Sequence, residues 1–472
     1  MTDEADGPGA RPSAERRAIS HDGRTFSISA TLEPLIPGDL LVLDAGGKDR
    51  YLGQVTELLP GTDGRAPARP GGLILGALDA DDRLAPKGRR PFRSATWAPA
   101  PASVLTGVQE AAQATLPVGM LSSVGVEVVA KLRAQGFGRH TFLCGQSGSG
   151  KTYALGVVLE QLLLGTDLRM VILDPNADFA RLGEPRPDAP DPAARRIAVT
   201  DIRTLSPRPN ASQPLRMRFA TMPRQAQAAV LRLDPLADRA EYNLFIQQME
   251  HPGVRDIDKV VLALLAGDFD QRALGQRIQN LGLPEWQVWA NELPSAAEVI
   301  ADGARATVLD LSGFKDPYEP LAVTLDLVEH LWLQRETRIP TLIVIDEAHN
   351  LCPSEPRGSL QTALVERLIQ IAAEGRKYGL WLLLSTQRPS KIHPQVLSQC
   401  DNLVLMRMNS PGDVAELTNV FGFAPQAMLN ASKYFSQGEA LLAGGFVPMP
   451  GIVRMGTRLT YEGGGDVGVP MG

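Results

Sequence analysis

The chain has 472 residues, 44% of them hydrophobic, and a net charge of −6, which allows about three domains with substantial cores. This acidic balance excludes a protein that coats nucleic acid with its whole surface, although a narrow positive channel for DNA stays possible. The cysteines Cys144, Cys352 and Cys400 lie far apart without metal-ligand spacing, which is typical of buried thiols in a reducing cytoplasm.

The N-terminal region shows no helical period. Residues 1–20 are polar and lack the apolar core of a signal peptide, so we expect a disordered tail. Short strand-like runs over residues 21–100, separated by Gly, Pro and Asp, predict a small β-barrel, with an irregular sandwich as the alternative. Residues 98–104, APAPASV, have the composition of a linker.

The rest of the chain alternates between strand and helix, which predicts a parallel α/β sheet. The alternation occupies residues 101–204 and returns over residues 301–460, whereas residues 205–300 have mostly helical patterns. We therefore predict one α/β domain interrupted by a helical insertion, followed by a C-terminal tail at residues 461–472. No apolar run approaches the ~18 residues of a membrane helix, so we expect a soluble, cytoplasmic protein without membrane contact.

A glycine-rich loop follows the first predicted strand of this domain. The segment GQSGSGKT matches the pattern G-x-x-x-x-G-K-T, in which backbone N–H groups turn inward around phosphate oxygens at a helix N-terminus. Lys151 is expected to pair with the β- and γ-phosphates of ATP, and the Thr152 hydroxyl to ligate Mg²⁺. A glycine turn without ligand is the alternative. The predicted nucleotide-binding residues are Gly145, Gln146, Ser147, Gly148, Ser149, Gly150, Lys151, Thr152 and Tyr153.

Two carboxylates follow another apolar strand, TLIVI. Asp346 is suited to hold the Mg²⁺ through water, and Glu347 to polarise the water that attacks the γ-phosphate. Successive side chains on a strand point apart, but at a frayed end Glu347 can turn toward the phosphate. This pair favours an ATPase over a simple nucleotide binder, and two solvated carboxylates are the alternative.

The run LLLSTQ delivers Gln387 to the end of a further strand. If that strand lies beside the one ending at Asp346, the Gln387 amide can donate to a phosphate oxygen and accept from the water. Gln387 would then report the presence of the γ-phosphate, whereas a glutamine that only caps the strand is the alternative. Asp174, which ends the strand LRMVILD, either orients a water near Mg²⁺ or caps a turn.

The order of these blocks resembles the HerA/FtsK family of hexameric DNA-translocating ATPases, and more closely its HerA branch. The resemblance covers most of residues 21–460. It implies an α/β fold with a RecA-like P-loop ATPase core, a parallel-rich sheet, a small N-terminal β-barrel and a helical insertion. The segments that carry it are RHTFLCGQSGSGKT, VILDPNADF, TLIVIDEAHNLCP, IAAEGRKYGLWLLLSTQRPSKIHPQVLSQCDNLVLMRM and GEALLAGG.

The resemblance also implies catalytic residues that act between subunits. In this family ATP lies between neighbouring subunits, and an arginine of one subunit completes the site of the next. Arg376 in EGRKYG is the leading candidate and Arg139 the second; a cation that complements a helix dipole is the alternative for Arg376. Arg357 and Lys391, on loops expected to face a pore, are the candidates for contacts with DNA phosphates.

As a whole, the resemblance implies a homo-oligomer, expected to be a hexamer, that uses Mg²⁺ and ATP to pull double-stranded DNA through a central channel. A separate nuclease or other effector would act with it in DNA processing or antiphage defence, because the sequence has no nuclease motif of its own. Two alternatives stay open: a nucleotide-gated scaffold that organises an effector without translocating DNA, and a secretion or conjugation ATPase of the same wider family.

Overall fold

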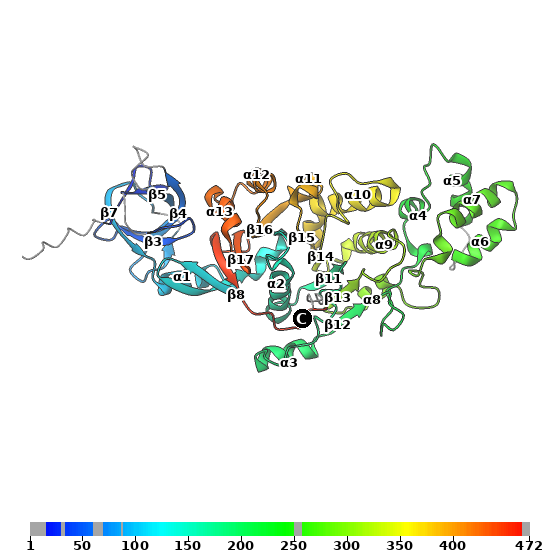
Figure 1. Cartoon of the computed structure of the whole chain (residues 1–472), viewed down its shortest axis with the longest axis horizontal. Helices are drawn as coiled ribbons and strands as arrows, with labels where there is room; N and C mark the ends of the chain where they lie inside the picture. The colour runs from blue at the N-terminus through cyan, green and yellow to red at the C-terminus, as the bar shows by residue number, and fades with distance from the viewer. Residues whose placement is uncertain (1–15, 30–33, 60–68, 86–87, 250–256, 465–472) are drawn as a thin grey trace, which may run out of the picture.

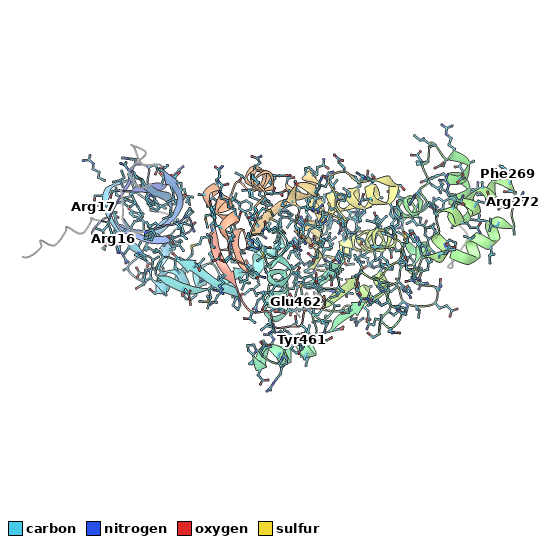
Figure 2. The ribbon with its side chains drawn as sticks, in the orientation of Figure 1. Arg16, Arg17, Phe269, Arg272, Tyr461 and Glu462 are labelled. Atoms are coloured by element: carbon cyan, nitrogen blue, oxygen red, sulfur yellow. The ribbon has the colours of Figure 1, made fainter. Side chains whose placement is uncertain are left out.

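The structure, a computed structural model, describes residues 16–29, 34–59, 69–85, 88–249 and 257–464. The molecule is elongated, with a small barrel at one end, a large sheet with its helices in the middle and a group of helices at the other end (Figure 1). Figure 2 shows the two extremes, where Arg16 and Arg17 mark the barrel and Phe269 and Arg272 mark the distal helices.

The barrel is closed. Within the described residues its strands follow the order β2-β1-β7-β3-β4-β5-β6, and β2 also pairs with β5, so that six strands close and β6 is a short addition. Side chains alternate in and out along β1 and β2, and the inward ones form a separate core. The predicted small barrel is therefore confirmed. Its strands are β1 (Arg17–Ser20), β2 (Thr25–Ile28), β3 (Leu40–Asp44), β4 (Arg50–Leu59), β5 (Arg69–Leu78), β6 (Leu84–Ala85) and β7 (Phe92–Pro99).

The structure differs from the sequence prediction at both borders of this barrel. Residues 17–20, expected in the tail, form β1, because Ala18 and Ser20 are buried between β2 and β7. Residues 98–104 are not a free linker, since β7 continues to Pro99 and helix α1 (Ala102–Ala111) starts three residues later. Residues 1–15 of the expected tail lie outside the described residues.

The central sheet combines a parallel and an antiparallel half. In the described part of the chain eleven strands follow the order β12-β13-β11-β14-β15-β10-β16-β17-β18-β8-β9. The strands from β12 to β16 run parallel, and each of the last four runs antiparallel to its neighbour. The parallel-rich α/β core is therefore confirmed, whereas β8, β9, β12 and β18 were not predicted. The bounds are β8 (Ala114–Ser123), β9 (Val126–Arg133), β10 (His140–Cys144), β11 (Arg169–Asp174), β12 (Ile202–Leu205), β13 (Ala306–Asp310), β14 (Thr341–Ile345), β15 (Leu380–Thr386), β16 (Cys400–Met406), β17 (Glu439–Gly444) and β18 (Gly451–Met455).

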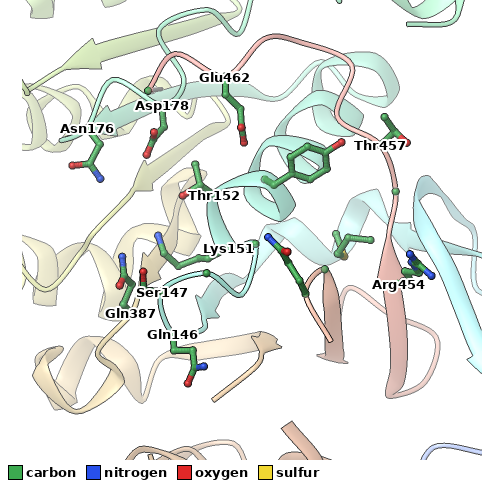
Figure 3. Close-up of a pocket in the computed structure, with 18 residues that line it drawn as sticks. Gln146, Ser147, Lys151, Thr152, Asn176, Asp178, Gln387, Arg454, Thr457 and Glu462 are labelled. Carbon is green, nitrogen blue, oxygen red and sulfur yellow. The ribbon is translucent and has the colours of Figure 1, made fainter. Parts of the chain in front are cut away.

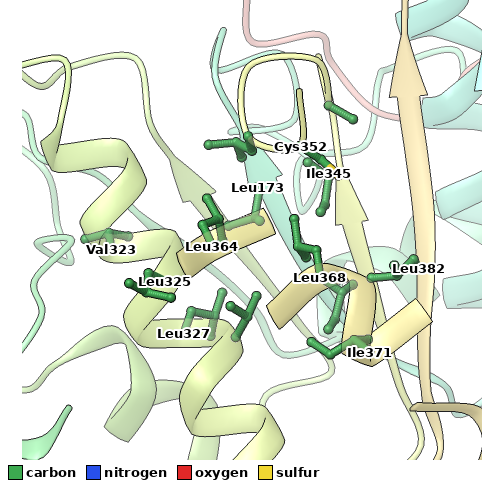
Figure 4. Packing of buried hydrophobic residues seen from close by; sticks show 14 of the residues in the cluster. Leu173, Val323, Leu325, Leu327, Ile345, Cys352, Leu364, Leu368, Ile371 and Leu382 are labelled. Carbon is green, nitrogen blue, oxygen red and sulfur yellow. The ribbon is translucent and has the colours of Figure 1, made fainter. Parts of the chain in front are cut away.

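Helices cover both faces of the parallel half. Helix α2 (Lys151–Gly165) packs on one face, and α9 (Glu319–Leu333) and α10 (Gly358–Glu374) pack on the other, where their leucines meet the strand side chains (Figure 4). Every residue of β10 and β14 is buried, as expected for strands covered on both faces. The loops that leave the carboxyl ends of these strands are thereby held on a rigid platform.

The distal helices form the insertion between β12 and β13. Residues 224–249 form two helices, not one, because the chain turns at Asp234, whose carboxylate accepts hydrogen bonds from the backbone N–H groups of Leu236 and Ala237. Helix α7 begins with a capping box made by Asp268 and Gln271. The insertion helices are α4 (Arg224–Val230), α5 (Arg239–Met249), α6 (Ile257–Leu265), α7 (Phe269–Asn280) and α8 (Ala296–Ala301).

The remaining helices are α3 (Asp191–Val199), α11 (Pro394–Leu397), α12 (Pro411–Val420) and α13 (Gln426–Ala431). Among the helices of the described residues, none has the length and apolar character needed to cross a membrane.

Candidate nucleotide-binding site

The glycine-rich loop between β10 and α2 borders a pocket of about 890 Å³, within the ~300–1,000 Å³ range of ligand pockets. It lies at the carboxyl ends of the parallel strands, where α/β sheets bind ligands. Gly150 has a φ of 92°, and a Cβ on Gly145 would come within 2.7 Å of Met406 Cβ. Both positions therefore require glycine, one for its conformation and the other for the close approach.

Lys151 lies at the base of this pocket between two carboxylates. Its Nζ is 2.8 Å from Asp346 Oδ1 and 3.0 Å from Glu347 Oε1, and it donates to the Ser385 hydroxyl at 3.2 Å. Burial alone would lower the pKa of Lys151, but the two carboxylates outweigh it and raise that pKa. Lys151 therefore stays positively charged. Its ammonium group could exchange the two carboxylates for the phosphates of a bound nucleotide.

The Glu347 backbone is in the left-handed region, with a φ of 43°. Such a conformation costs a non-glycine residue about 1–3 kcal/mol and is found mainly where function requires it. Here the left-handed conformation lets the adjacent side chains of Asp346 and Glu347 both contact Lys151. The turn that we expected at this frayed strand end is thus made by a strained backbone.

Strand β15 lies between β10 and β14 and pairs in parallel with both. Its end therefore reaches the pocket, where Gln387 Nε2 donates to Glu347 Oε1 at 2.9 Å. Ser385, two residues earlier, donates to Asp346 Oδ1 at 2.7 Å. The sequence analysis did not select Ser385, although its place in the polar end of an apolar run was the available signal.

His349 is a second residue that the sequence analysis did not select. Its Nδ1 lies 3.1 Å from the Thr386 hydroxyl and 3.4 Å from Glu347 Oε2. Burial lowers the pKa of His349, even though the Glu347 carboxylate acts in the opposite direction. His349 contacts Thr386 at the end of β15, whereas the buried Glu347 Oε2 has no hydrogen-bond partner among the described residues.

The residues predicted to hold Mg²⁺ fit that ion. Asp346 Oδ1 accepts hydrogen bonds from Lys151 and Ser385, whereas Asp346 Oδ2 is buried and has no hydrogen-bond partner among the described residues. The Thr152 side chain lines the same pocket (Figure 3). Carboxylate and hydroxyl oxygens are the donors that Mg²⁺ prefers, and the ion would offset the charge of bound phosphates.

Asp174 caps a turn. Its two carboxylate oxygens accept from the backbone N–H groups of residues 176, 178 and 179 at 3.3, 3.0 and 2.8 Å. Burial raises the pKa of Asp174 to about 7, and the charges of Asp178 and Asp346 add to that shift. The turn that Asp174 holds presents Asn176 and Asp178 to the pocket (Figure 3).

Arg376 and Arg139 are not brought to this pocket. Both pair with Asp401 Oδ2, at 2.8 and 3.3 Å, beside the first residues of β10 and β16. The pocket lies at the other end of β10, five residues away, which corresponds to about 16 Å along a strand.

Arg357 and Lys391 are exposed and lie on two loops that are joined. Pro353 and Ile392 form an antiparallel bridge, and Ser354 N donates to Lys391 O at 2.7 Å. These loops follow β14 and β15, so both leave the sheet at the same edge as the phosphate loop.

A phosphate loop with its lysine, a buried aspartate, an adjacent glutamate and a glutamine on a strand between them define a P-loop ATPase site. The family "Helicase HerA, central domain" matches residues 116–264, and the "ATPase family associated with various cellular activities (AAA)" matches residues 295–408. The chain therefore contains a P-loop ATPase domain, and its residues 116–264 are similar to the central domain of HerA helicases.

Curated relatives match the chain over limited segments. The probable DNA double-strand break repair helicase HerA of Methanocaldococcus jannaschii is 29% identical over 130 residues, 28% of this chain and 25% of the relative. The DNA double-strand break repair helicase HerA of Sulfurisphaera tokodaii is 33% identical over 118 residues, 25% of this chain and 23% of the relative. The matched segment thus spans about a quarter of these relatives.

Solved structures resemble the chain over larger parts but at low identity. VirB4 of Thermoanaerobacter pseudethanolicus is 13% identical with a TM-score of 0.49, and the match covers 73% of this chain and 96% of VirB4. The genome packaging NTPase B204 of Sulfolobus turreted icosahedral virus 2, in complex with AMPPCP, is 12% identical with a TM-score of 0.33, covering 67% of this chain and 96% of B204.

Proposed function

We propose that the protein is a ring-forming, ATP-driven translocase or helicase that acts on double-stranded DNA. The observation that carries the proposal is the contact of Lys151 with Asp346 and Glu347, together with the Gln387 amide on Glu347. In this proposal Lys151 is the phosphate ligand and Asp346 the metal ligand. Glu347 is the general base, and Gln387 is the γ-phosphate sensor. A site that only bound a nucleotide would not need the last two.

In the proposed reaction, ATP draws Lys151 from its carboxylates to the β- and γ-phosphates. Glu347 then accepts a proton from a water that attacks the γ-phosphorus, and the bond to the β-phosphate oxygen breaks. The Gln387 amide would contact the γ-phosphate while ATP is bound and return to Glu347 after hydrolysis. The end of strand β15 would therefore move when the γ-phosphate is lost. The loop that carries Lys391 follows β15 directly, which offers a short route from hydrolysis to movement of bound DNA.

The positions of Arg376 and Arg139 support an assembled ring. Neither side chain can reach the pocket of its own subunit from the opposite end of the sheet, so either could complete only the site of a neighbour. A homohexamer with ATP at each interface is the arrangement we propose, with Arg376 as the residue that acts in trans. The charge on the γ-phosphate would then be stabilised only in the ring.

Arg357 and Lys391 are proposed to contact DNA phosphates, which gives binding without sequence preference and with strong salt dependence. The names of the relatives, which describe DNA double-strand break repair helicases, favour this substrate. We further propose that a separate nuclease or other effector works with the ring, in DNA processing or antiphage defence in the cytoplasm.

The test is ATP hydrolysis with and without long duplex DNA, measured on a preparation whose hexameric state has been verified. The proposal predicts stimulation by duplex DNA that weakens as salt is raised. Slow hydrolysis that no form of DNA changes would refute the translocase and would instead indicate a nucleotide-gated scaffold.

A further inference from the structure

The pocket at the phosphate loop is longer than the phosphates need. Lys151 and Gln387 fix the γ-phosphate end, and the other end is lined by Gln437, Gly438 and residues 454–457 (Figure 3). Because the phosphate chain lies across the start of α2, the nucleoside must leave the loop at this second end. The residues there come from the far part of the chain, after β16.

Two hydrogen bonds attach this second end to the phosphate loop and to α2, and a third joins its own two segments. Gly438 N donates to Ser149 O at 3.0 Å, and Met455 N donates to Gly438 O at 2.8 Å. The Tyr153 hydroxyl, at the start of α2, accepts from Arg458 N at 2.8 Å. The wall is thus already positioned before any ligand binds, which reduces the entropic cost of recognition.

A buried charge anchors the wall from behind. Arg458 is 1% exposed, and its guanidinium lies 3.6 Å from the buried Glu160 of α2 and over the Phe179 ring. Glu160 also accepts from Leu459 N at 2.7 Å and Thr460 N at 2.9 Å. Burying charges is costly unless they are paired, so these contacts show that the segment is anchored to α2, which fixes the position of residues 454–457 beside the pocket.

The side chains at this end suit a nucleobase. The half-buried Tyr153 ring and Met455 thioether are flat or polarisable apolar surfaces. The Gln437 amide offers one donor group and one acceptor, and Arg454 offers donors only. Among the described residues, neither of these two side chains makes a hydrogen bond or an ion pair, and both line the pocket.

We propose that Tyr153, Gln437 and residues 454–457 form a subsite for the base and ribose of a purine nucleoside triphosphate. Tyr153 and Met455 contact the faces of the base, and Gln437 reads its hydrogen-bonding edge. The proposal rests on the nucleotide binding proposed above, and it makes the C-terminal segment a determinant of nucleotide choice.

The experiment measures dissociation constants by calorimetry for Mg·ATP, Mg·GTP and inorganic tripolyphosphate, in full-length protein carrying Glu347→Gln to block hydrolysis. Met455→Ala and Tyr153→Ala are expected to weaken ATP binding about tenfold, equal to ~1.4 kcal/mol, and to leave tripolyphosphate binding unchanged. Gln437→Ala is expected to reduce the preference between ATP and GTP. Tripolyphosphate reports on the phosphate loop alone, so it also shows that each variant is folded.

Tyr461→Ala is the matched control, because Tyr461 lines a neighbouring cavity of about 360 Å³ that shares Tyr153 with the pocket but does not include Met455. If Tyr461→Ala weakens ATP binding while Met455→Ala does not, the base lies in that second cavity and the proposed subsite is wrong. Unchanged ATP affinity in all three pocket variants also overturns it. A parent protein that binds neither ATP nor tripolyphosphate would overturn the proposed function itself, together with the subsite.

Discussion

At the scale of single residues, Glu347 shows how the backbone serves the site. A regular strand would turn the Glu347 side chain away from that of Asp346, and a left-handed residue at this point reverses that direction. Gln387 then donates to Oε1 of the redirected carboxylate, and His349 Nδ1 lies 3.4 Å from its Oε2. The strained conformation, the adjacent aspartate and these two contacts are consistent with a general base rather than a solvated carboxylate.

Glu347→Gln is therefore expected to reduce ATP hydrolysis by about 10²–10⁴-fold, the usual contribution of a general base, while ATP binding is retained. Steady-state hydrolysis and the ATP dissociation constant are the two measurements. Glu355→Gln, a change at an exposed carboxylate in the following loop, is the control and should leave both unchanged. Hydrolysis at the parent rate in Glu347→Gln would remove this residue from the mechanism.

At the scale of elements, two buried contacts attach the strands and helices that carry the site. His140, at the start of β10, accepts from Leu382 N at its Nδ1 (2.9 Å), and its Nε2 lies 3.0 Å from Ala372 O. Because an acceptor Nδ1 cannot carry a proton, the ring is neutral with its hydrogen on Nε2. This single side chain connects β10, β15 and α10.

Burial lowers the pKa of His140 to about 4, and the nearby Arg376 and Arg139 act in the same direction, whereas Asp401 and the hydrogen bond to Ala372 oppose it. As pH falls, the unfolded chain therefore takes up a proton at His140 at a higher pH than the folded chain does. The stabilising effect of the neutral His140 is lost between about pH 6.5 and pH 4. We expect His140→Gln to be less stable than the parent at pH 7 and nearly equal to it at pH 4.5. The measurement is the melting temperature of the parent and of His140→Gln between pH 7 and pH 4.5. A difference in melting temperature that stays the same across this range would contradict the prediction.

Arg458 and Glu160 make the second contact, between the C-terminal segment and α2. Arg458→Met leaves the buried Glu160 without its cation, which costs on the order of 3–5 kcal/mol for a buried pair. We expect this variant to melt several degrees below the parent. Arg454→Met, at an exposed arginine on the same segment, should melt like the parent. Equal melting of the two variants would show that the buried pair adds nothing to stability.

At the scale of the whole molecule, the sheet separates the two parts of the proposed reaction. The pocket lies at the carboxyl ends of the parallel strands, and Asp401 holds Arg376 and Arg139 at the amino ends. In the proposed mechanism, an isolated subunit would therefore contain the base and the phosphate ligands without an arginine finger. The proposed ring would supply this arginine from a neighbour that presents the opposite end of its sheet.

Mixed assemblies test this arrangement. Arg376→Ala and Glu347→Gln should each be inactive alone, but a mixture restores intact sites wherever an Arg376→Ala subunit receives its arginine from a Glu347→Gln neighbour. Roughly a quarter of the interfaces of a random equal mixture have this composition. We expect hydrolysis to recover to a comparable fraction of the parent rate. If both variants are inactive alone and their mixture also stays inactive, the arginine acts within its own subunit. If Arg376→Ala alone hydrolyses ATP at the parent rate, Arg376 is the wrong arginine, and the same mixing with Arg139→Ala then tests the second candidate.

Contiguous patterns in the sequence determined much of this protein. The phosphate loop, the pair Asp346 and Glu347 and the alternation of strands and helices are each encoded within a few neighbouring residues, so local geometry and period suffice to identify them. The same holds for the short strands of the barrel. Strand β15 was assigned from its apolar run, and its polar end marked Gln387 before any partner was known.

Only the tertiary structure decided which of these segments meet. It placed β15 between β10 and β14, gave Arg376 and Arg139 a shared Asp401, and brought Arg458 to Glu160 from 298 positions away in the sequence. Such pairings follow from how the whole chain packs, and no periodicity of a single segment records them. The residues proposed for catalysis could therefore be selected from the sequence, whereas those proposed to contact the nucleoside come together only where the end of the chain returns to the phosphate loop.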